Sequence, residues 1–225
     1  MNEGNKMGEP SEAGFPAGIT KAVLVFFVFI PALAGCVPSS DTEGVRRVLF
    51  DGRTLVGWHS AGDGEWSVVD GAIRGLNPEM HWNHLVTDDA GFGDFTATLK
   101  WRHVTGNTGI YLRAIEGGRF KMTGLQIELG SGRDGSVMWV SEDDYGFEPG
   151  SLSEDASGVI DPDGWNTLEF EVGDGWYKTM INGKTIIDNS AVTKMINARG
   201  SLALQMHAGE NNEVYFKDIE VSAIP

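Results

Sequence analysis

Residues 107–129 read NTGIYLRAIEGGRFKMTGLQIEL, and the alternation within them decides the fold class. Polar and apolar side chains alternate with a period of two in both halves, as they do in half-buried β-strands. Tyr111 and Arg113 share the polar face of the first half, and Gln126 and Glu128 share the polar face of the second. The apolar faces carry Ile110, Leu112, Ala114, Leu125, Ile127 and Leu129.

The polar residues of these two predicted strands admit two interpretations. In the first, Arg113 and Glu128 form an ion pair on a solvated sheet face, which contributes little to stability. In the second, the arginine, tyrosine, amide and carboxylate converge on one sheet surface and form a site for a ligand. This stretch alone leaves both interpretations open.

The same pattern continues along the chain. Asp70-Gly71 and Asn182-Gly183 are typical hairpin turns between alternating segments. The alternation of strands with helices that marks a parallel sheet is missing from the sequence. The pattern therefore predicts an all-β protein, built as an antiparallel β-sandwich. Further alternating segments cover residues 95–103, 165–172, 176–181 and 200–207.

The charge of the chain limits its partners. Lys and Arg number 17 against 32 Asp and Glu, which gives a formal net charge of -15. A charge of this sign opposes binding to nucleic acid or to an anionic membrane surface. The composition therefore favours a neutral ligand over a nucleic acid.

Residues 1–35 are predicted to be a signal peptide of the bacterial lipoprotein type. Lys21 precedes an apolar run over residues 22–33, which has the length of a signal peptide's apolar segment and is too short to span a bilayer. The run closes on Leu-Ala-Gly-Cys36, which resembles the bacterial lipobox, where the cysteine is acylated after cleavage before it. The resemblance implies a protein of the bacterial cell envelope, anchored in the membrane by lipid on Cys36.

Cys36 is the only cysteine of the chain. No thiol therefore remains for a disulfide, a thiolate metal site or a nucleophile. Residues 36–45 contain Pro and Ser and are predicted to be a flexible tether. Residues 46–225 then form one folded domain that its core alone must stabilise.

Polar residues recur at matching alternation on four predicted strands. If these strands are neighbours in a sheet, their polar faces merge into one surface with cations, a carboxylate, amides and an imidazole. The surface would then carry Lys100, Arg102, Tyr111, Arg113, Gln126, Glu128, Gln205 and His207.

Several familiar site types do not fit these residues. An ordinary glycosidase needs two carboxylates beside the scissile bond, and here Glu128 stands alone, with Gln126 at the position two residues before it. No Gly-x-Ser-x-Gly nucleophile elbow occurs. His81 and His84 lack a third metal ligand and are expected in an exposed loop, and the acidic segment 141–163 lacks calcium-loop spacing. The sequence predicts neither a metal nor a cofactor.

The ordered motifs of residues 48–221 resemble those of the 3-keto-disaccharide hydrolase family. The resemblance implies a concanavalin A-like sandwich, a jelly roll of two curved sheets, that acts on glycosides oxidised at the C3 hydroxyl. It rests on Leu49-Phe50-Asp51-Gly52, Leu55, Gly57-Trp58, Asp94-Phe95, residues 107–113, Gly124-Leu125-Gln126-Ile127-Glu128, Trp165-Asn166, Asn182-Gly183, residues 204–209 and residues 216–219.

This resemblance also implies a mechanism and roles for the residues. A C3 ketone acidifies the C2 proton, so that a base removes it, the aglycone leaves from C1, and water then adds to the enone. Glu128 and His207 are the base and acid, in either order, and Arg113 stabilises the enolate. The small carbohydrate substrate is held by Lys100, Tyr111, Gln126 and Gln205.

Two functions of other classes fit the same predicted fold. A non-catalytic carbohydrate-binding module of a lipid-anchored envelope protein would use exposed aromatic rings, for which Trp82, Trp139 and Tyr145 are candidates. A structural or adhesion domain would use the polar faces only for solvation. The distances among Arg113, Glu128 and His207 discriminate between an enzyme and these alternatives.

Overall fold

The computed structural model describes residues 45–77, 81–118, 121–153, 156–190, 192–194, 197–209 and 211–225. The chain forms two compact units, residues 1–40 and 41–225, and all described residues belong to the second. The predicted signal peptide, Cys36 and the tether up to residue 44 lie outside the described residues. Within the described part, no helix is long and apolar enough to cross a membrane.

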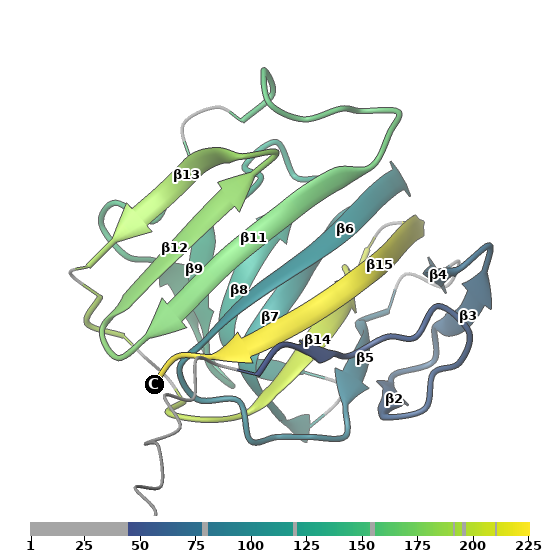
Figure 1. Cartoon of the computed structure of the whole chain (residues 1–225), viewed down its shortest axis with the longest axis horizontal. Helices are drawn as coiled ribbons and strands as arrows, with labels where there is room; N and C mark the ends of the chain where they lie inside the picture. Colours follow the sequence, from purple (N-terminus) through teal and green to yellow (C-terminus); the bar gives the residue numbers. More distant parts are fainter. Residues whose placement is uncertain are drawn as a thin grey trace, which may run out of the picture. The chain divides into compact units, whose positions relative to one another are not determined.

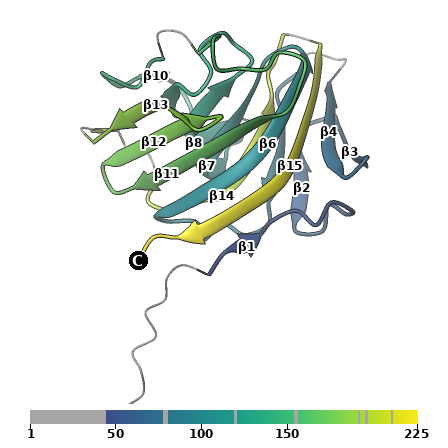
Figure 2. The same cartoon turned by 45° about the horizontal axis from the view of Figure 1, so that its top comes forward.

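Two antiparallel sheets face each other (Figures 1 and 2). The eight-stranded sheet has the order β13-β12-β11-β6-β15-β4-β3, with β1 beside β15, and the seven-stranded sheet has the order β10-β9-β8-β7-β14-β5-β2. The predicted antiparallel β-sandwich is therefore confirmed. The strands are β1 (Arg47–Val48), β2 (Trp58–Ala61), β3 (Glu65–Val69), β4 (Ala72–Asn77), β5 (Asn83–Thr87), β6 (Phe95–Thr105), β7 (Thr108–Glu116), β8 (Met122–Leu129), β9 (Val137–Val140), β10 (Tyr145–Phe147), β11 (Asn166–Gly173), β12 (Trp176–Ile181), β13 (Lys184–Asn189), β14 (Ser201–Met206) and β15 (Asn212–Ala223).

The core lies between the two sheets and consists of the apolar faces that period-two alternation predicts. Trp101 and Phe170 enter it from the eight-stranded sheet, and Ile110 and Ile127 enter it from the seven-stranded sheet; all four are fully buried. Burying one such side chain contributes about 1.5–3 kcal/mol. With each apolar face directed inward, the polar faces of β7, β8 and β14 point outward from the seven-stranded sheet.

A β-bulge interrupts the alternation of β7 at Arg113. Two residues lie between Leu112 and Ile115, while only one lies between their partners Leu125 and Thr123 on β8, and Arg113 has a left-handed φ of 52°. The extra residue exchanges the faces of the strand beyond it. Ala114 consequently lies on the outer face in a small cluster with Tyr111, so its predicted place in the core is wrong.

Candidate active site

The centre of the seven-stranded sheet brings polar residues from adjacent strands into one row. Glu128 on β8 pairs with Gly109 on β7, and Gly109 pairs in turn with Gln205 on β14. Gln205 pairs with His84 on β5. Directly paired residues project from the same face of a sheet. Glu128 and Gln205, with Gln126 two residues before Glu128, therefore share the face turned away from the core, which we call the outer face.

Three of these side chains form one hydrogen-bonded group. Gln126 Nε2 donates to Glu128 Oε1 at 2.6 Å and to Gln205 Oε1 at 3.1 Å. The amides thus fix the carboxylate and each other in one orientation. Gln205 is fully buried, and its Nε2 has no hydrogen-bond partner among the described residues. A buried donor without a partner is costly, so this group is suited to receive an oxygen atom of a ligand.

Gly109 provides the space in which the amides meet. A Cβ atom at this position would lie 2.8 Å from the Ile127 carbonyl oxygen, 3.0 Å from Gln126 Nε2 and 3.1 Å from Gln205 Oε1. Any larger residue must therefore displace the group or the backbone of β8. Gly109, a residue of the 107–113 motif that has no side chain, is thus part of the geometry of the site.

We expect Gly109→Ala to lower the free energy of unfolding by about 1–3 kcal/mol, the usual cost of overpacking. Urea denaturation measures this change. Gly158→Ala is the matched control, because a Cβ at Gly158 meets nothing within 4 Å. Equal stability of the two variants would contradict this prediction, because it would show that the outer face accommodates an added methyl group at residue 109.

The environment of Glu128 favours its protonated form. Glu128 as a whole residue is 9% exposed. Burial raises the pKa of its carboxyl, and a hydrogen bond from Ser131 and the charges of His207 and Arg133 oppose this effect in part. Burial, helped by the charge of Glu128, likewise raises the pKa of Tyr111. The Glu128 carboxyl therefore releases its proton at a higher pH than an exposed glutamate does, and its carboxylate is the stronger base.

His207 follows β14 directly and lies near enough to Glu128 for its charge to lower the pKa of that carboxyl. His207 Nδ1 lies 2.6 Å from the carbonyl oxygen of Ala208. A carbonyl oxygen only accepts hydrogen bonds, so Nδ1 carries a hydrogen. Nε2 is then the nitrogen that can exchange a proton with a ligand.

Aromatic rings border the polar group on the side of β5. The Trp82 ring lies edge-on to His207 at 4.5 Å and parallel to His84 at 6.4 Å, and His84 lies edge-on to Tyr111 at 5.3 Å. The expected exposed loop is wrong for His84, which is 1% exposed within β5. The alternation of His84 with Val86 was the signal for its placement on the outer face.

The expected convergence on one surface is wrong for three residues, Lys100, Arg102 and Arg113. Lys100 belongs to β6 of the eight-stranded sheet, where its Nζ lies 2.9 Å from Asp218, on the opposite side of the sandwich from Glu128. Arg113 is turned away by the bulge, and its guanidinium donates to the Gly93 carbonyl at 2.8 Å and to Asp94 at 2.6 Å. Arg113 therefore neither forms an ion pair with Glu128 nor joins it in a ligand site, so both expected interpretations are wrong for Arg113.

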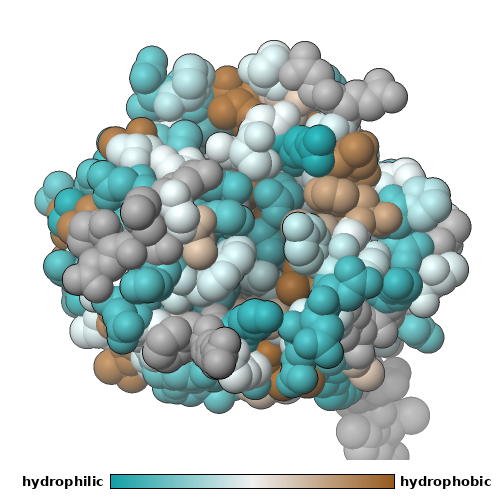
Figure 3. All heavy atoms as spheres, turned by 180° about the vertical axis from the view of Figure 1, so that it is seen from behind, coloured by the Kyte–Doolittle hydropathy of each residue, from teal (hydrophilic) through white to brown (hydrophobic). Residues whose placement is uncertain are grey.

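Arg102 also belongs to the eight-stranded sheet. Of the predicted surface, the structure thus brings together Tyr111, Gln126, Glu128, Gln205 and His207. Figure 3 views the molecule from the side of the seven-stranded sheet, where hydrophilic residues gather around a hollow in the middle of the face. Within the described residues, no three His, Cys, Asp or Glu side chains are grouped so that they could hold a metal ion.

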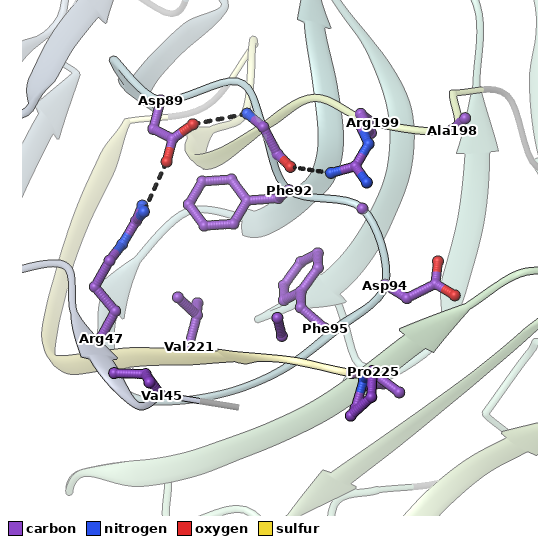
Figure 4. Close-up of a pocket in the computed structure, with 14 residues that line it drawn as sticks. Val45, Arg47, Asp89, Phe92, Asp94, Phe95, Ala198, Arg199, Val221 and Pro225 are labelled. Atoms are coloured by element: carbon purple, nitrogen blue, oxygen red, sulfur yellow. Dashed lines mark hydrogen bonds and ion pairs between the residues drawn. The ribbon is translucent and has the colours of Figure 1, made fainter. Parts of the chain in front are cut away.

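A pocket of about 550 Å³ lies apart from this group, between the start of β6 and the end of β15 (Figure 4). Its polar groups are paired: Arg47 binds Asp89 at 2.7 Å, and Arg199 donates to the Gly91 carbonyl at 2.8 Å. Phe92 and Phe95 form its apolar floor. No predicted site residue lines it, so the candidate site remains the outer face around Glu128.

Comparison with solved structures identifies relatives of this fold. A candidate glycosyl hydrolase from Parabacteroides distasonis ATCC 8503 superposes with a TM-score of 0.63 at 23% identity, covering 82% of this chain and 95% of that one. A protein of unknown function with a galectin-like fold from Bacillus subtilis gives 0.57 at 13% identity, covering 79% and 94%. The carbohydrate-binding module CBM66 from Bacillus subtilis gives 0.56 at 13% identity, covering 74% and 96%. At these identities the likeness establishes the sandwich fold alone.

Sequence comparison establishes the family. No curated protein matches the chain. A family model described as the 3-keto-alpha-glucoside-1,2-lyase-like domain matches residues 46–222. This match covers nearly all of the second compact unit and every residue of the candidate site. It confirms the resemblance that the ordered motifs indicated, and the chain belongs to the 3-keto-alpha-glucoside-1,2-lyase-like domain family.

Proposed function

We propose that this protein cleaves 3-keto glycosides, including 3-keto disaccharides, by eliminating the aglycone and then hydrating the product. The observation that carries the proposal is the buried Glu128 carboxyl, oriented by Gln126 and lying near His207 on the outer face. Such a group is suited to proton transfer. Membership of the family supports the choice of substrate.

The reaction has two stages, elimination of the aglycone and hydration of the product. A base takes the proton from C2, which the C3 ketone acidifies, and the electron pair of that C–H bond forms an enolate. The enolate electrons then form the C1–C2 double bond, the C1–O bond breaks, and an acid protonates the departing oxygen. Water finally adds its hydroxyl to C1 and a proton to C2, so the net reaction is hydrolysis.

The geometry suggests how the residues share this work. Glu128 acts as the base, because burial raises the pKa of its carboxyl and Gln126 orients it. His207 protonates the departing oxygen through Nε2. The unpartnered Nε2 of Gln205 donates to the C3 oxygen as negative charge develops there. This last role replaces the one expected of Arg113, which lies elsewhere.

The proposal is tested with a panel of 3-keto glycosides and their unoxidised parents in D2O. We expect only the oxidised glycosides to be cleaved, and the released 3-keto sugar to carry deuterium at C2 from the hydration step. The 3-keto sugar incubated without protein corrects for spontaneous exchange. Cleavage of the unoxidised parents without deuterium at C2 would instead indicate an ordinary glycosidase.

A non-catalytic sugar-binding module is the second candidate, favoured by the row of rings formed by Trp82, His84 and Tyr111. The expected platforms differ in the structure. Trp139 packs against the core with Lys194 Nζ 3.7 Å from its ring centre, while Tyr145 is 70% exposed. Sugar binding without turnover on the whole panel would favour this candidate.

We also propose that the protein is attached to the bacterial cell envelope through lipid on Cys36, as the lipobox-like residues 33–36 suggest. In the lipoprotein pathway, Cys36→Ala removes the acceptor of the lipid. We expect wild-type protein in the membrane fraction, and the variant either released or left as an uncleaved precursor. Mass spectrometry of the N-terminus measures the modification. Unacylated wild-type protein in the cytoplasm would contradict the proposal.

A further inference from the structure

The outer face does not end at the polar group but continues onto β9 and β10. Gln126 pairs with Met138 on β9, and Met138 pairs with Phe147 on β10. One row along, Val140 pairs with Tyr145. Since paired residues share a face, these four apolar residues form a strip beside the site. We call Met138, Val140, Tyr145 and Phe147 the apolar strip.

The apolar strip is more open than the strand residues on the other side of the site. Tyr145 is 70% exposed, and Met138, Val140 and Phe147 are half-buried. On the other side of the site, the outer face of β14 and β5 carries Ala203 and Val86, both of which are completely covered. Trp82, just before β5, is half-buried but packs against His207. An apolar group of a ligand therefore finds its aligned contacts on the side of β9 and β10.

The apolar strip also adjoins the proposed reaction centre. Neighbouring strands lie roughly 4.8 Å apart, so Met138 and Phe147 lie roughly 5 and 10 Å from Gln126 across the sheet. The exposed Arg133 lies between the two regions: its guanidinium is 5.9 Å from the Phe147 ring, and its charge lowers the pKa of Glu128. When a sugar is bound over Gln126 and Glu128, a group attached to it reaches the apolar strip while it stays in contact with the outer face of the sheet.

We infer that the apolar strip binds the aglycone of the substrate and selects glycosides with an aromatic or other large apolar aglycone. This inference rests on the proposed function for the identity of the sugar. Scattered apolar residues on a surface need no explanation. Here, strand register aligns the four residues of the apolar strip beside Gln126 and Glu128, which are proposed to act on the glycosidic bond. Tyr145, with its ring in solvent, contributes stacking area.

The test compares ethyl and 2-phenylethyl 3-keto-glucosides, because both release a primary alcohol and differ only in the apolar group. We expect wild-type protein to prefer the phenylethyl substrate in kcat/KM by about tenfold, the scale of a small apolar pocket. Tyr145→Ser should remove most of this preference by raising KM for the phenylethyl substrate alone. Tyr145→Phe should retain it.

Tyr145 is exposed, so its replacement leaves the core untouched. Val56→Ser is the matched control, because Val56 is 84% exposed in the turn before β2, at the other edge of the same sheet. Equal kcat/KM for both substrates in the wild type, or an unchanged preference in Tyr145→Ser, would overturn the inference.

A failure of the proposed function is distinguishable from a failure of the subsite. If neither 3-keto-glucoside is cleaved, calorimetry with unoxidised 2-phenylethyl and ethyl glucosides decides the point. Binding of the phenylethyl compound alone, weakened by Tyr145→Ser and not by Val56→Ser, supports the apolar strip as a ligand site by itself. Equal affinity of the two compounds, or no binding of either, overturns it.

Discussion

Glu128→Gln and His207→Asn should each lower kcat on a 3-keto glycoside by roughly a hundredfold or more, which is the usual scale for loss of a general acid or base. Glu128→Gln keeps the size of the side chain, and His207→Asn keeps a hydrogen-bond donor near the position of Nδ1, but each removes proton transfer. Affinity for the sugar should therefore change little. Steady-state kinetics with the purified protein, together with a binding measurement, separates the two effects.

The pH dependence of kcat assigns the roles. Burial raises the pKa of Glu128, so the limb on which activity rises with pH should lie above the range of an ordinary carboxyl group. Glu128→Gln should abolish that limb, and His207→Asn should abolish the limb on which activity falls at higher pH. The reverse pattern would make His207 the base and Glu128 the acid.

The control for these variants is Glu169→Gln on β11 of the eight-stranded sheet, which removes a carboxylate remote from the site. Its activity should equal that of the parent. Urea denaturation confirms that each variant is folded. Full activity in both Glu128→Gln and His207→Asn would contradict the proposed mechanism, whatever the substrate.

Arg113→Met should lower the free energy of unfolding by about 1–3 kcal/mol, because it removes the hydrogen bonds of a buried side chain to the Gly93 carbonyl and to the half-exposed Asp94. The Arg113 side chain is 4% exposed, and its guanidinium connects the bulge of β7 to the Gly93 carbonyl and Asp94, just before β6. The bulge itself is held by Asn197, whose Nδ2 donates to the Arg113 carbonyl at 2.9 Å. Arg113 thus connects β7 of the seven-stranded sheet to the start of β6 of the eight-stranded sheet.

Turnover per folded molecule should stay near the parent's value in Arg113→Met, because Arg113 lies away from Glu128. Lys100→Met is the matched control: Lys100 is a cation in an ion pair too, but its side chain is 43% exposed and the pair is solvated, so the loss should be below about 1 kcal/mol. A fully stable Arg113→Met variant with little turnover would return Arg113 to the active site.

The sequence determined the features that depend on period-two alternation. Every core residue expected from 107–129 except Ala114 is buried between the sheets. The polar faces of β8 and β14, with Gln126, Glu128 and Gln205, are directed outward together. Alternation is a local property of an extended chain, so it needs no knowledge of the neighbouring strands.

The tertiary structure alone decided which polar faces meet and where the alternation is interrupted. Lys100 alternates as regularly as Gln126, but the two outer faces of a sandwich look alike in sequence, and only the strand order places Lys100 on the far side. Arg113 leaves the site because a single left-handed residue inserts a bulge. That conformation is held by contacts to Gly93, Asp94 and Asn197, two short segments that lie far from residue 113 in sequence. Such contacts between distant segments cannot be read from a local pattern, and they decide the composition of the site.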